Sequence, residues 1–177
     1  IAAMLAEAFR EPGERMPIAP LGAIGLVAAA IATAALWSRS AESFGVVRAD
    51  KLGLFVTGVL IVVGALSLAY SGSTVSREHL PQGEYYALLL FSLSGMVLMA
   101  TAVDLIVIFI ALEVLSLGIY VLTAIRRDRP KAVEAAFKYF LLGTFASAFF
   151  LYGIALTYGL AGSTHLDRVA DAFAQTA

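Results

Sequence analysis

The sequence predicts an all-α protein, a polytopic transmembrane helix bundle, from three observations. Of the 177 residues, 60% are hydrophobic and only 14% are charged, whereas a typical soluble domain has about 25% charged residues. Three stretches of 22, 25 and 19 residues contain no charged side chain, and a helix that spans a bilayer needs about 20 residues. Short polar segments separate these stretches, which are residues 17–38, 52–76 and 85–103.

The same composition excludes several classes of function. The net charge is −1 and no basic patch occurs, so nucleic-acid binding is excluded. The chain has no cysteine and therefore no disulfide framework. His79 and His165 stand apart in polar segments, so we expect no metal site. The sequence also lacks a Gly-rich phosphate loop and a haem-ligating His pair, and we expect no cofactor to be bound by this chain.

The first complete span is predicted at about 17–37. Trp37 ends it, at the membrane interface where amphipathic aromatic rings prefer to lie. Residues 1–9 are also apolar and begin without a methionine. We therefore expect the chain to be an N-terminal fragment and residues 1–9 to be the end of an earlier span.

The second span is predicted at about 52–70, followed by a polar loop at 71–83. Gly53, Gly58 and Gly64 lie within this span. Small residues allow helices to approach closely in membrane bundles, so we expect a neighbouring backbone at these glycines.

The segment 84–125 contains only three charged residues but is too long for one span. At 1.5 Å per residue, a single helix of this length would be ~63 Å long, about twice the ~30 Å hydrocarbon core. We therefore predict two spans, at about 84–101 and 104–125, joined by a tight turn. Asp104 is expected to be the N-cap of the second of these helices.

A charged loop, Arg126–Lys131, follows, and a fifth span is predicted at about 131–160. We expect Asp128 to cap this helix, with Pro130 in its first turn, where the missing N–H costs nothing. The tail 164–177 is expected to be interfacial or exposed.

The positive charges of the loops predict the orientation of the chain. The loops on one side (7–16, 71–83 and 126–137) carry seven Lys and Arg residues, and those on the other side carry four. Cytoplasmic loops carry an excess of these residues, so the loop 126–131 is predicted to be cytoplasmic.

Glu113 is the first candidate site residue because it lies in the middle of the predicted fourth span. It is about 14 Å from one end of a straight helix and about 18 Å from the other. An ionised acid at the bilayer centre costs at least ~2.5 kcal/mol, so the group must be protonated, hydrated or paired. Intramembrane acids usually mark ion or proton paths. The alternative is a neutral acid that is hydrogen-bonded to Ser116 or to a neighbouring carbonyl.

Lys138 is the second candidate, on the following span. Measured from the loop between the spans, Glu113 and Lys138 lie at depths of about 21 and 15 Å, an axial offset of ~6 Å. The two side chains would meet directly or through water if their helices turn them toward each other. The alternative is a pair with Glu134, four residues earlier on the same helix, or a lysine that extends to the interface.

Three blocks resemble the antiporter-like membrane subunits of respiratory complex I, and most of all the N-type subunits of bacterial proton-translocating NADH:quinone oxidoreductases. The resemblance is strongest over residues 83–162 and includes the 25-residue spacing of the Glu and the Lys. The blocks are Glu113–Leu122, Arg126–Arg129 and Glu134–Gly143.

The resemblance implies an inverted-repeat fold of about fourteen spans with broken helices at mid-membrane, of which this chain holds spans two to six. It implies that Glu113 is the essential glutamate of helix five and that Lys138 is the buried lysine of helix six. Both would be proton-relay residues, with a further lysine partner on a broken helix beyond residue 177.

The resemblance further implies a multi-pass subunit of a bacterial inner membrane that translocates protons and has no redox centre. Its partners would be the bilayer and the other membrane subunits of complex I. NADH, FMN, iron–sulfur clusters and quinone would be bound elsewhere in the complex.

Two alternatives remain open. A cation/proton antiporter or a membrane-bound hydrogenase subunit of the same extended family would also keep a membrane glutamate and lysine. A structural membrane subunit would use Glu113 and Lys138 only to hold two helices together.

Overall fold

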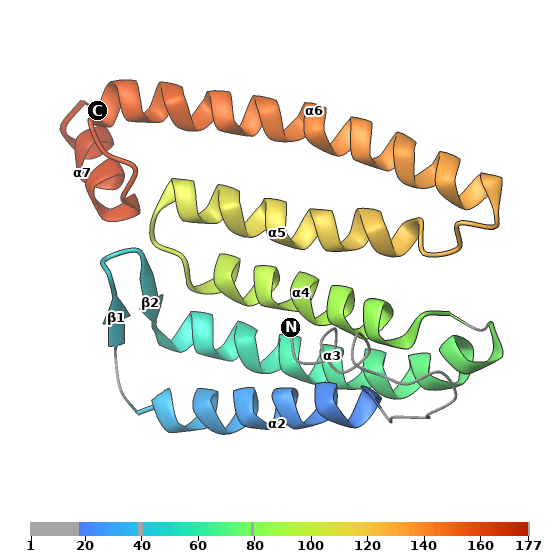
Figure 1. Ribbon diagram of the computed structural model, residues 1–177. Coiled ribbons are helices and arrows are strands. Elements are labelled where there is room, and N and C mark those ends of the chain that lie inside the picture. The colour runs from blue at the N-terminus through green and yellow to red at the C-terminus, as the bar shows by residue number, and fades with distance from the viewer. Residues whose placement is uncertain (1–17, 39–40, 79, 177) are drawn as a thin grey trace.

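The computed structural model describes residues 18–38, 41–78 and 80–176. The expected earlier span at residues 1–9 lies outside these residues. Within them, five long helices lie side by side, and each runs antiparallel to the next (Figure 1). All five are long and apolar enough to cross a membrane. The predicted all-α class is therefore confirmed. The helices are α2 (Ile18–Leu36), α3 (Lys51–Arg77), α4 (Gln82–Thr101), α5 (Leu105–Thr123) and α6 (Pro130–Ala161).

Helix α3 continues beyond the predicted end of its span at Tyr70 and ends at Arg77. The hydroxyls of Ser71 and Ser73 donate to the carbonyls of Leu68 and Tyr70, at 3.1 and 3.5 Å. These polar side chains therefore bond to the helix itself rather than ending it, because a serine hydroxyl can reach a carbonyl one turn back.

The predicted cap of α5 is confirmed, but that of α6 is wrong. Asp104 accepts hydrogen bonds from the backbone N–H groups of Ile106 and Val107, at 2.8 and 3.4 Å. The N-cap residue of α6 is Arg129, with Pro130 at the first helical position. Asp128 instead accepts a hydrogen bond from Arg126 at 3.1 Å, since the guanidinium competes for its carboxylate.

Helices α4 and α5 approach each other closely at two glycines. A Cβ atom at Gly95 would lie 2.6 Å from the backbone N of Leu115 and 2.9 Å from the carbonyl O of Ala111. A Cβ atom at Gly118 would lie 3.0 Å from the carbonyl O of Leu88. The small residues permit this packing, as is common between membrane helices.

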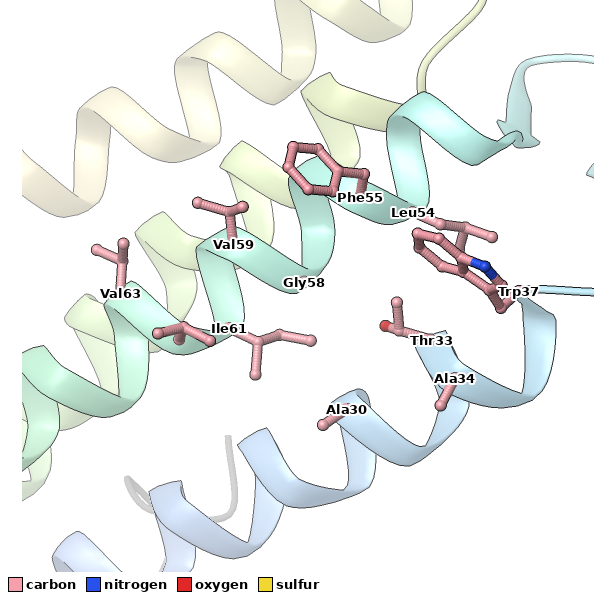
Figure 2. A pocket seen from close by; sticks show the side chains of 11 residues that line it. Ala30, Thr33, Ala34, Trp37, Leu54, Phe55, Gly58, Val59, Ile61 and Val63 are labelled. Carbon is pink, nitrogen blue, oxygen red and sulfur yellow. The ribbon is translucent and has the colours of Figure 1, made fainter.

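Helices α2 and α3 are separated by an apolar groove of about 750 Å³, shown in Figure 2. Gly58 lies in this groove and has no atom within 4 Å of the place where a Cβ would stand. A Cβ at Gly53 would lie 3.0 Å from the carbonyl O of Ala100, and one at Gly64 would lie 2.6 Å from Leu93 Cδ2. The predicted approach of a neighbouring backbone is thus confirmed at Gly53, whereas a side chain packs on Gly64 and nothing packs on Gly58.

One end of the bundle carries two elements that were not predicted, the hairpin of β1 (Ala41–Ser43) and β2 (Val47–Ala49), and helix α7 (Leu166–Thr176). Both lie at the end where α4 turns into α5 (Figure 1). Backbone hydrogen bonds of 2.9 Å join Val103 to Val46 and to Leu166. The α4–α5 turn is therefore held between the hairpin and the chain that leaves α6.

The opposite end of the bundle is held by ion pairs. Arg126 bonds to Glu78 just after α3, and Arg129 lies 3.8 Å from the same carboxylate. Arg127 lies 3.6 Å from Glu84 in α4. The loop between α5 and α6 is thus tied to α3 and α4.

Candidate functional site

Glu113 lies on the side of α5 that faces α6. Its helical neighbours on that side are Phe109 and Tyr120, four residues before it and seven after it. The ring of Phe109 lies 6.3 Å from that of Phe150, and the ring of Tyr120 lies 5.8 Å from that of Phe140, both in α6. The residues of α5 that meet α4 lie on the opposite side of the helix.

The carboxyl oxygen Oε1 of Glu113 is buried and has no hydrogen-bond partner among the described residues. The alternative interpretation of Glu113 expected a hydrogen bond to Ser116 or to a neighbouring carbonyl. This oxygen makes neither bond among the described residues. A buried polar atom without a partner is costly. The oxygen is therefore available to a proton, a water molecule or a donor from another part of the protein.

The aromatic contacts also define which residue of α6 lies opposite Glu113. Because Phe109 pairs with Phe150 and Tyr120 with Phe140, the antiparallel register places Glu113 level with Ala146 and Ser147, and Ala146 is exposed. Ser147 is half-buried. Sequence reasoning missed this residue, since only the register between two helices brings it to the glutamate.

Lys138 lies on the face of α6 that points away from α5. It is two residues, and so about 200° around the helix, from Ala136, which is buried on the α5 side. The side chain is 69% exposed, and its Nζ lies 2.5 Å from Oε1 of Glu134. Of the two arrangements expected for Lys138, the structure thus has the pair with Glu134.

The axial offset of ~6 Å that the sequence predicted between Glu113 and Lys138 is too small. Lys138 is nine residues from the level of Ser147, which corresponds to ~13 Å along the helix. The reason is that α6 begins well beyond the end of α5, as Figure 1 shows. The two side chains therefore differ in both height and direction, and no ion pair or hydrogen bond joins them within the described chain.

No group of three His, Asp or Glu side chains in the described residues is arranged to hold a metal ion. The groove between α2 and α3 has only apolar walls apart from Thr33, whose hydroxyl donates to the carbonyl of Ala29 at 2.8 Å. Neither feature contributes an ionisable group to the site at Glu113.

Two carboxylates outside the spans are paired with arginines. The guanidinium of Arg48 lies 2.7 Å from Asp167 and lowers the pKa of this carboxyl. Arg126 likewise lowers the pKa of Asp128. The first pair joins β2 to α7 and the second lies within the loop between α5 and α6, so neither belongs to the site at Glu113.

Comparison with known proteins relates the chain to one family. Residues 102–177 match the family model described as NADH:quinone oxidoreductase/Mrp antiporter, transmembrane. The NADH-quinone oxidoreductase subunit N of Chloroflexus aggregans is 40% identical over 168 residues, which are 94% of this chain and 34% of that protein. The subunit N of Trichlorobacter lovleyi is 38% identical over 176 residues, 99% of this chain and 36% of that protein.

Solved structures are also similar. Respiratory complex I from Thermus thermophilus with bound aureothin contains a chain with a TM-score of 0.77 and 32% identity, covering 93% of this chain and 36% of that one. A membrane-bound sulfane sulfur reductase, an archaeal respiratory membrane complex, has a TM-score of 0.80 at 22% identity, over 95% of this chain and 36% of that one. The chain spans about a third of the length of these relatives. The matches and the five apolar helices make it a multi-pass membrane protein.

Proposed function

Because the chain belongs to the antiporter-like membrane subunits of NADH:quinone oxidoreductases, we propose that it is part of the N subunit of a proton-translocating NADH:quinone oxidoreductase. The relatives that carry this name are similar to the chain over nearly all of its length. Since the chain spans about a third of each relative, the activity is proposed for the longer subunit and not for residues 1–177 alone.

Glu113 is the proposed proton-relay residue of this segment. The observation that supports this role is the buried and unpartnered carboxyl oxygen at the contact of α5 and α6. In the membrane interior such a group changes its protonation with the charge of its neighbours, because desolvation opposes ionisation and a nearby cation favours it. A change of charge near Glu113 would therefore load or release its proton.

Lys138 is the second proposed relay residue. It faces away from α5, so it would exchange protons with groups that pack on the outer face of α6. Its partner among the described residues is Glu134. A lysine beside a carboxylate can hold a proton or give it up as the neighbouring charge moves. Glu113 would then transfer protons on the side of α6 that faces α5, and Lys138 on the opposite side of α6.

The redox chemistry is proposed to take place in other subunits. NADH, FMN, iron–sulfur clusters and quinone would be bound there, and the energy of quinone reduction would reach this subunit through changes of charge or conformation. The other membrane subunits of the complex and the bilayer are its proposed partners.

We further propose a bacterial inner membrane as the location, with the loop 126–131 in the cytoplasm. The positive-inside rule supports this orientation. The hairpin and α7 lie at the other end of the bundle and would face the periplasm.

The decisive experiment replaces Glu113 by Gln in the full-length subunit and measures proton pumping and NADH:quinone turnover in membranes, with assembly of the complex checked in parallel. Gln keeps the size and the hydrogen bonding but carries no transferable proton. We expect pumping per assembled complex to fall at least about tenfold, because a positioned proton-transfer group contributes roughly 10²- to 10⁴-fold.

Glu84→Gln is the matched control, because Glu84 is 51% exposed and its ion pair among the described residues is with the exposed Arg127. It should leave pumping unchanged. Normal pumping by an assembled Glu113→Gln complex would show that the glutamate is structural in this protein.

The family description also names Mrp antiporters, which makes cation/proton exchange the second candidate function. Proton pumping that depends on NADH and proceeds without Na⁺ or K⁺ supports the first function. Proton movement that requires one of these cations and does not depend on NADH supports cation/proton exchange.

A further inference from the structure

We propose that Tyr120 is a further residue of the proton path, with its hydroxyl held in a notch of α6 at Gly143. The inference rests on the proposed function, because it assigns an additional group to the relay at Glu113. Four observations support it: the fit of the ring at Gly143, the polar groups on the same side of α5, the lack of a partner for Oε1 of Glu113, and the height of the hydroxyl in the bundle.

Gly143 makes room for the hydroxyl of Tyr120. A Cβ atom at this glycine would overlap the Tyr120 Oη and would lie 2.6 Å from Cζ. The ring is only 8% exposed and stands edge-on to Tyr139 and Phe140, at 4.9 and 5.8 Å. The hydroxyl is therefore held at a defined place on the surface of α6 rather than free to turn.

The hydroxyl belongs to a row of polar groups along the α6 side of α5. Glu113, Ser116 and Tyr120 follow the spacing i, i+3 and i+7, which places them on one face of a helix. The row spans ~10 Å at 1.5 Å per residue. Ser147 adds a fourth group from α6 at the level of Glu113.

Several other hydroxyls of the spans are bonded to the backbone of their own helix. The hydroxyls of Thr57, Ser67 and Thr123 each donate to a carbonyl four residues earlier, at 2.7–2.8 Å. In the described part of the chain, by contrast, Oε1 of Glu113 is buried without a hydrogen-bond partner, as is Oγ of Ser92 in α4. Groups of this kind in a membrane interior bind water, and a water molecule with several polar partners can be retained there.

Tyr120 also stands at the height that a connecting group needs. Its ring is level with Phe140, whereas Glu113 is level with Ser147, so the hydroxyl lies between the heights of Glu113 and Lys138. In the proposed step, the phenol oxygen accepts a proton from a water on the Glu113 side while its own O–H proton passes to a water on the other side. The tyrosine is neutral before and after the step, so no oxidant or other reactant is required.

The test uses the full complex and compares three subunit variants. Tyr120→Phe removes the hydroxyl and keeps the ring. Tyr120→Phe with Gly143→Ser returns a hydroxyl close to this place from α6, and the ring must shift slightly because the new Cβ would stand 2.6 Å from Cζ. Tyr120→Phe with Gly143→Ala is the matched control, which fills the notch without a hydroxyl.

We expect Tyr120→Phe to lower pumping per assembled complex about fivefold or more, within the range of a positioned proton-transfer group. Gly143→Ser should restore most of this loss and Gly143→Ala should not. Equal rescue by serine and alanine would mean that the notch serves packing alone, and normal pumping by Tyr120→Phe would also overturn the proposal.

The result with Glu113→Gln separates this inference from the proposed function. If Glu113→Gln abolishes pumping while Tyr120→Phe pumps normally, only the role of Tyr120 is wrong. If Glu113→Gln pumps normally, the relay at Glu113 itself is wrong.

Discussion

Two ionisable residues of the spans lie in very different surroundings. Glu113 has a buried carboxyl oxygen at the contact of α5 and α6, whereas Lys138 is 69% exposed on the outer face of α6. The lysine is therefore placed to meet groups beyond the described residues, and its own helix supplies only Glu134. A role in proton transfer and a role as a surface ion pair make different predictions for Lys138.

Replacement of Lys138 by Gln tests these two roles. If Lys138 carries protons, pumping per assembled complex should fall about fivefold or more. Lys131→Gln is the control from the same helix and should leave pumping unchanged. Equal pumping by the Lys138 and Lys131 variants would assign Lys138 to the surface pair.

At the scale of elements, the helix contacts are not equivalent. Helices α4 and α5 are in backbone contact at Gly95 and Gly118, while α2 and α3 leave an open groove at Gly58. A glycine in a span therefore either permits close helix packing or lines an open groove, and only the neighbouring helix shows which role it has.

A methyl group at Gly95 should separate α4 from α5. The Cβ of Gly95→Ala would stand 2.6 Å from a backbone nitrogen that cannot move alone, and overpacking of this kind costs about 1–3 kcal/mol. The expected result is a lower thermal midpoint of the purified complex. Gly58→Ala, which meets no atom within 4 Å, should leave the midpoint unchanged or raise it, and a similar loss in both variants would contradict the packing described here.

The contact between the hairpin and α7 should depend on pH. Arg48 lowers the pKa of Asp167 in the folded protein, so the pair stabilises the contact fully above the ordinary Asp pKa of about 3.9. The stabilisation is lost as the pH falls through the lower pKa of the folded state.

Spin labels at Phe44→Cys and Gln175→Cys would measure this contact, since the chain has no cysteine of its own. We expect the distribution of distances between the labels to be narrow at pH 7 and to broaden below about pH 4. Asp167→Asn should broaden it at every pH. A distance distribution that changes neither with pH nor with this substitution would show that the backbone hydrogen bonds hold α7 without the ion pair.

At the scale of the whole molecule, the bundle has two different ends. Three arginines of one loop pair with carboxylates at the ends of α3 and α4. The hairpin, the α4–α5 turn and α7 form the other end. Because each of the five helices is long enough to cross a membrane, the two ends of the bundle should face opposite sides of it.

Labelling of single cysteines from either side tests the proposed orientation. Arg127→Cys, at a side chain that is 81% exposed, should react only when the reagent reaches the cytoplasmic side. Phe44→Cys, at a residue that is 98% exposed, should react from the periplasmic side of intact cells. The reverse pattern would overturn the orientation and with it the positive-inside argument for this chain.

Local chemistry in the sequence was enough to determine the class of the protein and its five spans, and to mark Glu113 as a candidate site residue. Long uncharged stretches must form helices in a bilayer, because every backbone group has to be hydrogen-bonded there. Asp104 was recognisable as a cap, since capping involves only the next three residues. Glu113 stood out because desolvation makes an acid at that depth costly. Helix α7 could also have been predicted, because its apolar residues Leu166, Val169 and Phe173 follow helical spacing.

Only the tertiary structure decided how the helices face one another. It placed Ser147 opposite Glu113, turned Lys138 away from it, and seated the Tyr120 hydroxyl at Gly143. The rotation and register of a helix depend on side chains that interlock with its neighbours, and an apolar segment has no marked face that would reveal them. The same interlocking explains why Gly58 lies in a groove while Gly95 lies against a backbone.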